Sequence, residues 1–148
     1  MKSFFAYVLV ALAAQVSAAP VGSSSKCRGW TVSPLQHAVG QNPVFAANDA
    51  VTLKWNVKKS QVKYIREIGL FSAKSKEFLH TQFRSYPGID ATTGQLTFNL
   101  SVPLCLQREG EYYLGVYSST PGNDGDCSTK TPNFKLTADP NGNYTVCN

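Results

Sequence analysis

The sequence is poor in the residues and motifs that build catalytic and metal sites. It contains two histidines, His37 and His80, and neither lies in a recognisable catalytic motif. It has no G-x-S-x-G stretch of the kind that carries a hydrolase serine, and no Cys-x-x-Cys spacing of the kind that binds zinc. We therefore expect a non-enzymatic protein with no metal and no cofactor.

Long apolar runs are also scarce. The sequence has one, and it lies at the N-terminus. Lys2 precedes an apolar stretch from Phe4 to Ala14, and small residues follow it. This layout predicts a secretory signal peptide over residues 1–18, cleaved after Ala18, with an uncleaved amphipathic anchor as the alternative. The run is shorter than the ~20 residues of a membrane-spanning helix, and no hydrophobic tail signals a lipid anchor. We expect a secreted protein without a transmembrane segment.

All the cysteines follow the predicted signal peptide, at Cys27, Cys105, Cys127 and Cys147. In a small secreted domain an even number of cysteines indicates disulfide bonds, here two. The chain also holds two sequons, Asn99-Leu-Ser and Asn143-Tyr-Thr, which predict N-glycosylation of a secreted protein.

Charge is unevenly distributed along the chain. Residues 54–84 carry eight basic side chains against two acidic ones, whereas residues 85–148 carry three against six. A basic segment suits an anionic polymer or a membrane surface, and ordinary solvated charge scatter is the alternative. Nucleic acid is not an expected partner, because no recognition motif accompanies the charge and a secreted chain rarely meets nucleic acid.

Apolar residues recur at a period of two along most of the chain, which is typical of β-strands with one buried face. Residues 51–57 and 96–102 alternate most clearly. Further strands are expected over residues 30–33, 64–72, 78–86, 109–119 and 133–137, with those at 64–72 and 78–86 more buried. Turn signals such as Pro87-Gly88, Thr93-Gly94 and Pro121-Gly122 separate them.

About seven short strands predict an all-β fold, an antiparallel sandwich of the immunoglobulin or fibronectin-III kind, with a closed barrel as the alternative. Gly110-x-Tyr112 matches the start of strand F in immunoglobulin-like domains, where a tyrosine hydroxyl bonds back to the preceding loop. Leu114 stands where antibody domains carry a cysteine. The expected organisation is a signal peptide (1–18), an N-terminal lead with the first strand (19–42), the sandwich (43–137) and a C-terminal tail tied by a disulfide (138–148).

The expected topology favours one cysteine pairing. In such a sandwich the N-terminus and the loop between strands F and G share one end, whereas the loop before strand F and the C-terminal tail share the other. Two cysteines flanking strand F at opposite ends would be roughly 26 Å apart, too far for a disulfide. The predicted bonds are therefore Cys27–Cys127 and Cys105–Cys147.

The segment PVFAANDAVTLKW (43–55) resembles the start of the immunoglobulin-like N-terminal domain of fungal cell-wall proteins, which include β-1,6-glucan biosynthesis proteins and Ser/Thr-rich GPI-anchored wall proteins. The residues that fit the family's opening pattern are Phe45, Ala47, Val51, Leu53 and Trp55. The stretches QLTFNLSV, EGEYYLGVYSS and TPNFKL also look like this domain, so the resemblance covers residues 43–137. It implies a fungal protein of the cell wall or the extracellular space.

The chain departs from that family in lacking a Ser/Thr-rich stalk and a GPI signal, and in having four cysteines. It looks like a stand-alone secreted version, for which wall anchoring and glucan synthesis are not expected.

In a strand formed by the run EGEYYLGVYSS (109–119), alternate side chains face the core and the outside. If Tyr112 faces the core, Tyr113 and Tyr117 point outward on one face, where aromatic rings can stack on a sugar chain. Coverage of these rings by neighbouring lysine stems is the alternative. The candidate binding residues are Tyr113 and Tyr117 with Lys54, Lys58 and Lys63 of the basic segment.

Other residues offer weaker candidates. Glu109 and Glu111 could form the carboxylate pair of a glycosidase, but turn and edge charges explain them more simply. Residues 123–126 are expected to form a turn between strands F and G rather than a calcium loop. The expected function is binding of wall polysaccharide by a secreted module; the alternative is a secreted effector that binds a partner protein.

Overall fold

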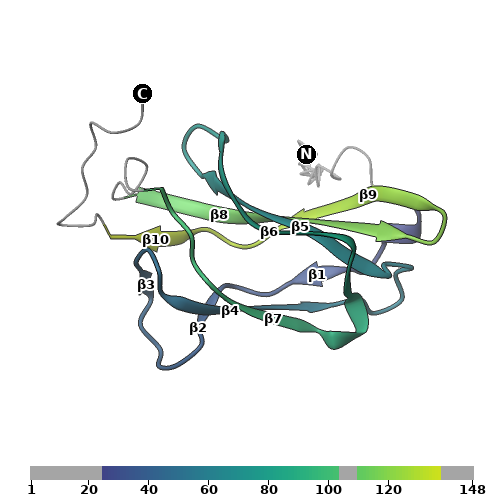
Figure 1. The fold of residues 1–148 in the computed structure, drawn as a ribbon, viewed down its shortest axis with the longest axis horizontal. Coiled ribbons are helices and arrows are strands. Elements are labelled where there is room, and N and C mark those ends of the chain that lie inside the picture. The colour runs from purple at the N-terminus through teal and green to yellow at the C-terminus, as the bar shows by residue number, and fades with distance from the viewer. Residues whose placement is uncertain (1–24, 104–109, 138–148) are drawn as a thin grey trace, which may run out of the picture.

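The computed structural model describes residues 25–103 and 110–137, with the side chains of residues 123–126 left aside, and this part of the chain is built almost entirely of β-strands. Two sheets lie as two layers, one above the other in Figure 1. The two helical turns are short 3-10 segments, η1 (Ser25–Cys27) and η2 (Ala91–Thr93). Within the described ranges, no helix has the length and apolar character needed to cross a membrane.

The smaller sheet is arranged around β4 (Ala50–Asn56), whose neighbours are β1 (Thr31–Val32), β2 (Gln36–His37) and β7 (Gln95–Asn99). The alternation in the sequence is confirmed, since every second residue of β4 is buried and the others are not. β1 and β2 pair with successive parts of β4. Between them Pro34 interrupts the strand and Leu35 turns into the core.

The larger sheet has the order β3 (Val44–Phe45), β10 (Phe134–Leu136), β8 (Gly110–Thr120), β5 (Tyr64–Ser72) and β6 (Phe78–Asp90), and β9 (Asn123–Lys130) also pairs with β8. All its pairs are antiparallel except β3 with β10, which run parallel. β9 and β10 lie along the same strand β8, one after the other.

The break between β9 and β10 is centred on Thr131. Its hydroxyl accepts a hydrogen bond from the Leu114 amide at 3.0 Å, and its own amide donates to the Leu114 carbonyl at 2.9 Å. The side chain thus supplies the acceptor that a regular strand would supply from its backbone. Thr131 is buried at this bend, so its polar group is satisfied where solvent cannot reach it.

One hydrophobic core fills the space between the two sheets. The smaller sheet contributes Val51, Leu53 and Trp55 from β4, and the larger sheet contributes Ile65, Ile68, Leu70, Leu114 and Val116 from β5 and β8. The Trp55 indole donates a hydrogen bond to the Ala91 carbonyl at 2.8 Å, which ties β4 to η2. A buried indole N–H with a partner avoids the cost of an unsatisfied donor.

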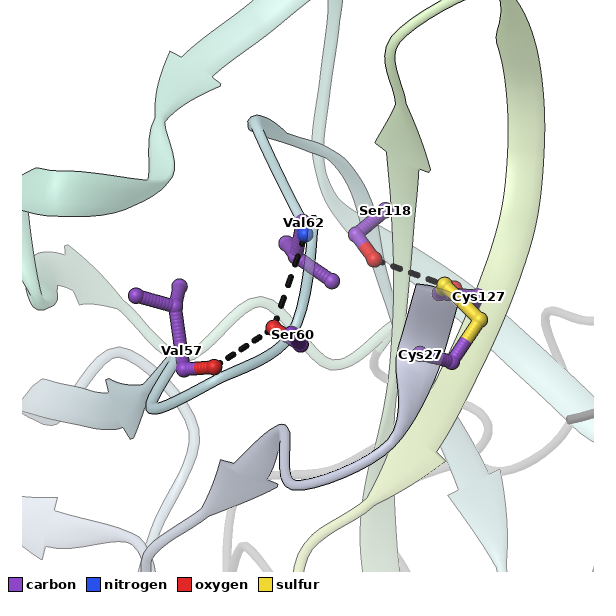
Figure 2. The surroundings of a disulfide bond; sticks show 6 residues. All are labelled: Cys27, Val57, Ser60, Val62, Ser118 and Cys127. Atoms are coloured by element: carbon purple, nitrogen blue, oxygen red, sulfur yellow. Dashed lines mark hydrogen bonds between the residues drawn. A yellow bond between two sulfur atoms is a disulfide. The ribbon is translucent and has the colours of Figure 1, made fainter. Parts of the chain in front are cut away.

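A disulfide joins η1 to β9, as predicted for Cys27 and Cys127. Their Cα atoms lie 5.6 Å apart, within the range that a disulfide spans. Figure 2 shows the bond beside Ser118, whose hydroxyl donates to the Cys127 carbonyl at 3.3 Å. Cys127 is fully buried, and the loop that contains Ser60 is among the surroundings of the bond that Figure 2 shows.

Three expectations were wrong in detail. Residues 123–126, expected as a turn, begin the strand β9, because Pro121 and Gly122 alone make the turn and Thr120 already pairs with Asn123. Pro87-Gly88, expected as a turn, lies inside β6, where the register with β5 shifts. β6 is an edge strand and contains no fully buried residue, in contrast to the more buried strand expected over residues 78–86.

Several other expectations lie outside the described residues. These are the signal peptide over 1–18, the Cys105–Cys147 bond, the sequon at Asn143, and the loop before β8 to which the Tyr112 hydroxyl was expected to bond.

Candidate functional site: the outer face of the larger sheet

β8 presents its side chains alternately to the core and to the outer face of the larger sheet. The core side carries Tyr112, Leu114 and Val116, all buried as predicted. The outer side carries Tyr113, Gly115 and Tyr117, and both tyrosines are half-buried. The sequence therefore predicted the direction of these side chains correctly. Whether Tyr113 or Tyr117 can contact a ligand depends on the groups that surround it.

Tyr113 belongs to a row of three aromatic rings that crosses three strands. Its ring lies parallel to that of Phe71 on β5, with centroids 5.3 Å apart and planes 2° from parallel. Phe71 in turn meets Phe78 of β6 edge-on at 5.5 Å. Both are favourable arrangements for aromatic pairs, so the row stabilises the outer face as well as making it apolar.

Two glycines form the floor beneath this row. Gly69 of β5 and Gly115 of β8 are direct cross-strand partners. A Cβ atom at Gly115 would lie 2.7 Å from Cε2 of Phe71, and one at Gly69 would lie 3.0 Å from Cε2 of Phe78. The rings can lie flat on the sheet because neither glycine has a side chain in the way.

Lysines partly cover Tyr113. The Lys130 amine lies 5.0 Å from the centre of its ring and the Lys76 amine 5.7 Å, both within cation–π range. The ring of Tyr113 therefore contacts Phe71 and the two lysines of the protein itself. For this tyrosine the alternative of coverage by lysine stems is realised.

Tyr117 is differently placed. It stands between two open pockets of about 410 and 470 Å³, and lines both. The first pocket is lined by Phe71, Tyr113, Gly115, Tyr117, Ser128, Thr129 and Lys130, and the second by Arg66, Glu67, Arg84, Ser85, Tyr86 and Tyr117. Within the described part of the chain, its ring stacks on no aromatic residue or cation and its hydroxyl makes no hydrogen bond. Of the two tyrosines, Tyr117 is thus the one whose ring and hydroxyl can contact a ligand.

Charged groups surround Tyr117 on one side. Glu67 is its cross-strand neighbour, and Arg84 donates a hydrogen bond to the Glu67 carboxylate at 2.8 Å. Arg66 lies over the ring of Tyr86 at 5.1 Å. Partial burial raises the pKa of the Tyr117 phenol, and the negative charge of Glu67 adds to that rise. The phenol is therefore a neutral hydrogen-bonding group over an extended alkaline range.

The structure does not bring the predicted lysines to this face. Lys54 lies on the outer side of β4 in the other sheet, paired with Gln95 of β7. Lys58 lies in the turn after β4, and Lys63 immediately precedes β5, with its amine 5.4 Å from the ring of Tyr64. The cations that line the two pockets are instead Lys130, Arg66 and Arg84.

The sequon residue Asn99 ends β7 and is exposed, on the same outer side of the smaller sheet as Thr97 and Gln95. A glycan attached there would extend from the sheet that does not carry the tyrosines.

A further pocket of about 480 Å³ lies between the β2–β3 loop and the bend before β10. His37 lines it, but its ring stacks on Phe45 at 4.3 Å, and its Nε2 is 3.1 Å from the Val44 carbonyl. Its Nδ1 lies 3.8 Å from the Asp49 carboxylate. The ring thus has a stacking partner and a polar neighbour at each nitrogen. The described residues that line this pocket include no serine, threonine, cysteine or lysine.

Of the remaining catalytic candidates, Glu111 and His80 lie in the described part of the chain. Glu111 is exposed on β8, and Glu109 lies outside the described residues. His80 is half-buried on β6, as expected for a strand histidine. In the described ranges, no three His, Cys, Asp or Glu side chains are grouped so that they could hold a metal ion.

Comparisons of the chain with protein-family models, with curated proteins and with solved structures find no match.

Proposed function

We propose that the protein is a secreted, non-enzymatic, immunoglobulin-like module that binds polysaccharide through the outer face of its larger sheet. The observation that carries this proposal is the position of Tyr117. A half-buried tyrosine that lines two adjoining open pockets, with no partner for its ring or hydroxyl among the described residues, offers an apolar surface and a hydrogen-bonding group together. Sugars present the same combination of C–H faces and hydroxyl groups, and aromatic side chains suit such ligands.

The strand order supports the immunoglobulin-like assignment. Strands β1 and β2, β4 and β7 correspond to strands A, B and E of such a sandwich, and β10 and β9, β8, β5 and β6 correspond to G, F, C and C′. The chain crosses from the smaller sheet to the larger one between β2 and β3, where β3 runs parallel to β10. Localisation outside the cell or at a fungal wall follows from the predicted signal peptide and the family resemblance, and remains part of the proposal.

The proposed binding surface consists of Tyr117, Gly115 and Lys130 with the rings of Phe71 and Tyr113 that line the same pocket, and it does not include Phe78. Lys54 and Lys58 are left out, because they lie away from both pockets. Lys54 therefore provides a matched control: a basic residue on the opposite sheet whose loss should not affect binding.

Retention on insoluble β-glucan, chitin and mannan at low salt tests the proposal. We expect the wild-type protein to be retained on at least one polymer, Tyr117→Ala to weaken retention at least fivefold, and Lys54→Ala to leave it unchanged. Absence of retention on all three, or equal retention of Tyr117→Ala, would contradict polysaccharide binding at this site, provided that circular dichroism shows the variant to be folded.

A partner protein is the second candidate, and one observation favours it. Phe78 is 51% exposed and Tyr86 is 73% exposed, and both lie on β6 at the edge of the same sheet. Exposed aromatic residues are enriched at protein interfaces. Loss of binding in Phe78→Ala together with retention in Tyr117→Ala, in a pull-down from extracts of another organism, would favour this candidate over the first.

A further inference from the structure

We infer that the ligand of the Tyr117 surface is a polymer of N-acetylated amino sugars, and that the pocket between Tyr113 and Tyr117 receives the acetamide group of one sugar ring. This inference rests on the proposed function and adds the chemical class of the sugar. It comes from the arrangement of apolar and polar groups around the pocket of about 410 Å³.

This pocket has room for a group that projects from a sugar ring. Tyr113, Gly115 and Tyr117 belong to the outward side of β8, and all three line the pocket. Because the middle residue is a glycine, no side chain of β8 stands between the two tyrosines. A flat aromatic surface suits the bare face of a sugar ring, whereas a pocket also accepts a substituent of that ring.

One end of the pocket is formed by aromatic rings. Phe71 and Tyr113 are cross-strand partners whose parallel rings have centroids 5.3 Å apart, and both line the pocket. Removal of a ligand methyl group from water against such rings is favourable. Lys130 also lines the pocket, but its amine lies 5.0 Å from the centre of the Tyr113 ring. This end therefore suits an apolar group and requires no charge on the ligand.

The other end of the pocket has a pair of hydroxyl groups. Ser128 of β9 is the cross-strand partner of Tyr117, so both side chains point to the outer face. Ser128 is exposed, and within the described ranges neither its hydroxyl nor that of Tyr117 makes a hydrogen bond. A hydroxyl can both donate and accept a hydrogen bond, so the pair can bind the N–H and the C=O of one amide.

An acetamide group matches both ends at once. Its amide can bond to the hydroxyls of Tyr117 and Ser128 while its methyl packs against the rings of the other end. The hydroxyl that a glucan or a mannan carries at the same carbon has no apolar part, so it can satisfy only the polar end. A polymer with an acetamide on each sugar ring therefore fits this pocket better than a plain glucan does.

The test compares oligosaccharides of chitin and of cellulose of equal length, which differ only in carrying an acetamide or a hydroxyl on each ring. We expect the full protein to bind the chitin oligosaccharide about five- to tenfold more tightly in calorimetry. Ser128→Ala should reduce this preference about threefold, because it removes one hydrogen-bonding partner of the amide. Ser33→Ala is the matched control, since Ser33 is an exposed serine directly after β1 of the smaller sheet.

The outcomes separate the two proposals. Equal or tighter binding of the cellulose oligosaccharide, or an unchanged preference in Ser128→Ala, would overturn the inference and leave the proposed function standing. Retention on β-glucan or mannan without binding of the chitin oligosaccharide would do the same. Absence of binding to every polysaccharide, or binding that Tyr117→Ala does not weaken, would overturn both proposals.

Discussion

The ring of Phe71 lies directly over Gly115, so that a methyl group on this glycine would come within 2.7 Å of Cε2 of the ring. The two residues sit on adjacent strands of the larger sheet, and Tyr113 stacks on the same ring from the neighbouring position of β8. The glycine thus determines where the aromatic row lies, and thereby the floor of the pocket next to Tyr117.

Gly115→Ala should displace Phe71 and separate it from Tyr113, because Phe78 holds the ring on its other side. We expect the free energy of unfolding to fall by about 1–3 kcal/mol, as for other overpacked sites, with a change in near-ultraviolet circular dichroism. Gly110→Ala is the control on the same strand, because its nearest contact would be an ordinary 3.6 Å. Equal stability of the two variants in urea denaturation would contradict the role assigned to Gly115.

The phenol of Tyr117 should lose its proton at a higher pH than free tyrosine amide, since burial and the charge of Glu67 raise its pKa. A raised pKa in the folded state means that its contribution to stability is complete below the ordinary tyrosine pKa of about 10 and is lost as pH rises through the folded value. NMR of ring-labelled tyrosine measures this directly. In Glu67→Gln the pKa should fall but remain raised, because burial is the larger cause; no change in that variant would contradict the assignment.

A comparison of the two tryptophans measures how much one indole hydrogen bond contributes to the free energy of unfolding. Trp55 donates to the Ala91 carbonyl, whereas the buried indole N–H of Trp30 has no partner among the described residues. Trp55→Phe should therefore lower the free energy of unfolding by about 1–3 kcal/mol more than Trp30→Phe does. Denaturant titrations of both variants provide the comparison, and a larger loss in Trp30→Phe would show that the bond to Ala91 is not what stabilises this end of β4.

The Cys27–Cys127 bond closes a segment with a sequence separation of 100 residues. Replacement of both cysteines by alanine should lower the free energy of unfolding by about 2–4 kcal/mol, mainly because the unfolded chain gains freedom. Urea denaturation of the double variant checks this, and a loss below about 1 kcal/mol would contradict it. Peptide mapping without reduction should find Cys105 joined to Cys147; Cys105 joined to Cys127 would contradict the predicted pairing.

Strands with a regular alternation could be predicted from the sequence, because burial of one face leaves a period of two. Residues 64–72 form β5 with the predicted bounds, and β4 and β8 differ from the prediction by one residue at their ends. β9 was not predicted, because it has few apolar residues and so shows no alternation. Its pairing with β8 depends instead on backbone hydrogen bonds and on the buried disulfide.

The site was predictable only in part. The outward direction of Tyr113 and Tyr117 followed from the alternation of β8, whereas their different surroundings depend on strand register, which the sequence does not contain. The pairing of Gly69 with Gly115 and of Glu67 with Tyr117 arises from two strands more than forty positions apart. The lysines of the basic segment were misleading as a group, because strand alternation and turns distribute them over both sheets and the ends between them.

The central claim is that a saccharide binds at Tyr117, and a chemical-shift map of the labelled protein titrated in turn with soluble oligosaccharides of β-glucan, chitin and mannan tests it most directly. We predict that backbone amide shifts concentrate on Gly115, Tyr117, Lys130 and Glu67, and that Lys54 and Thr97 on the smaller sheet do not move. Shifts concentrated on the smaller sheet, or none at oligosaccharide concentrations up to the millimolar range, would contradict it.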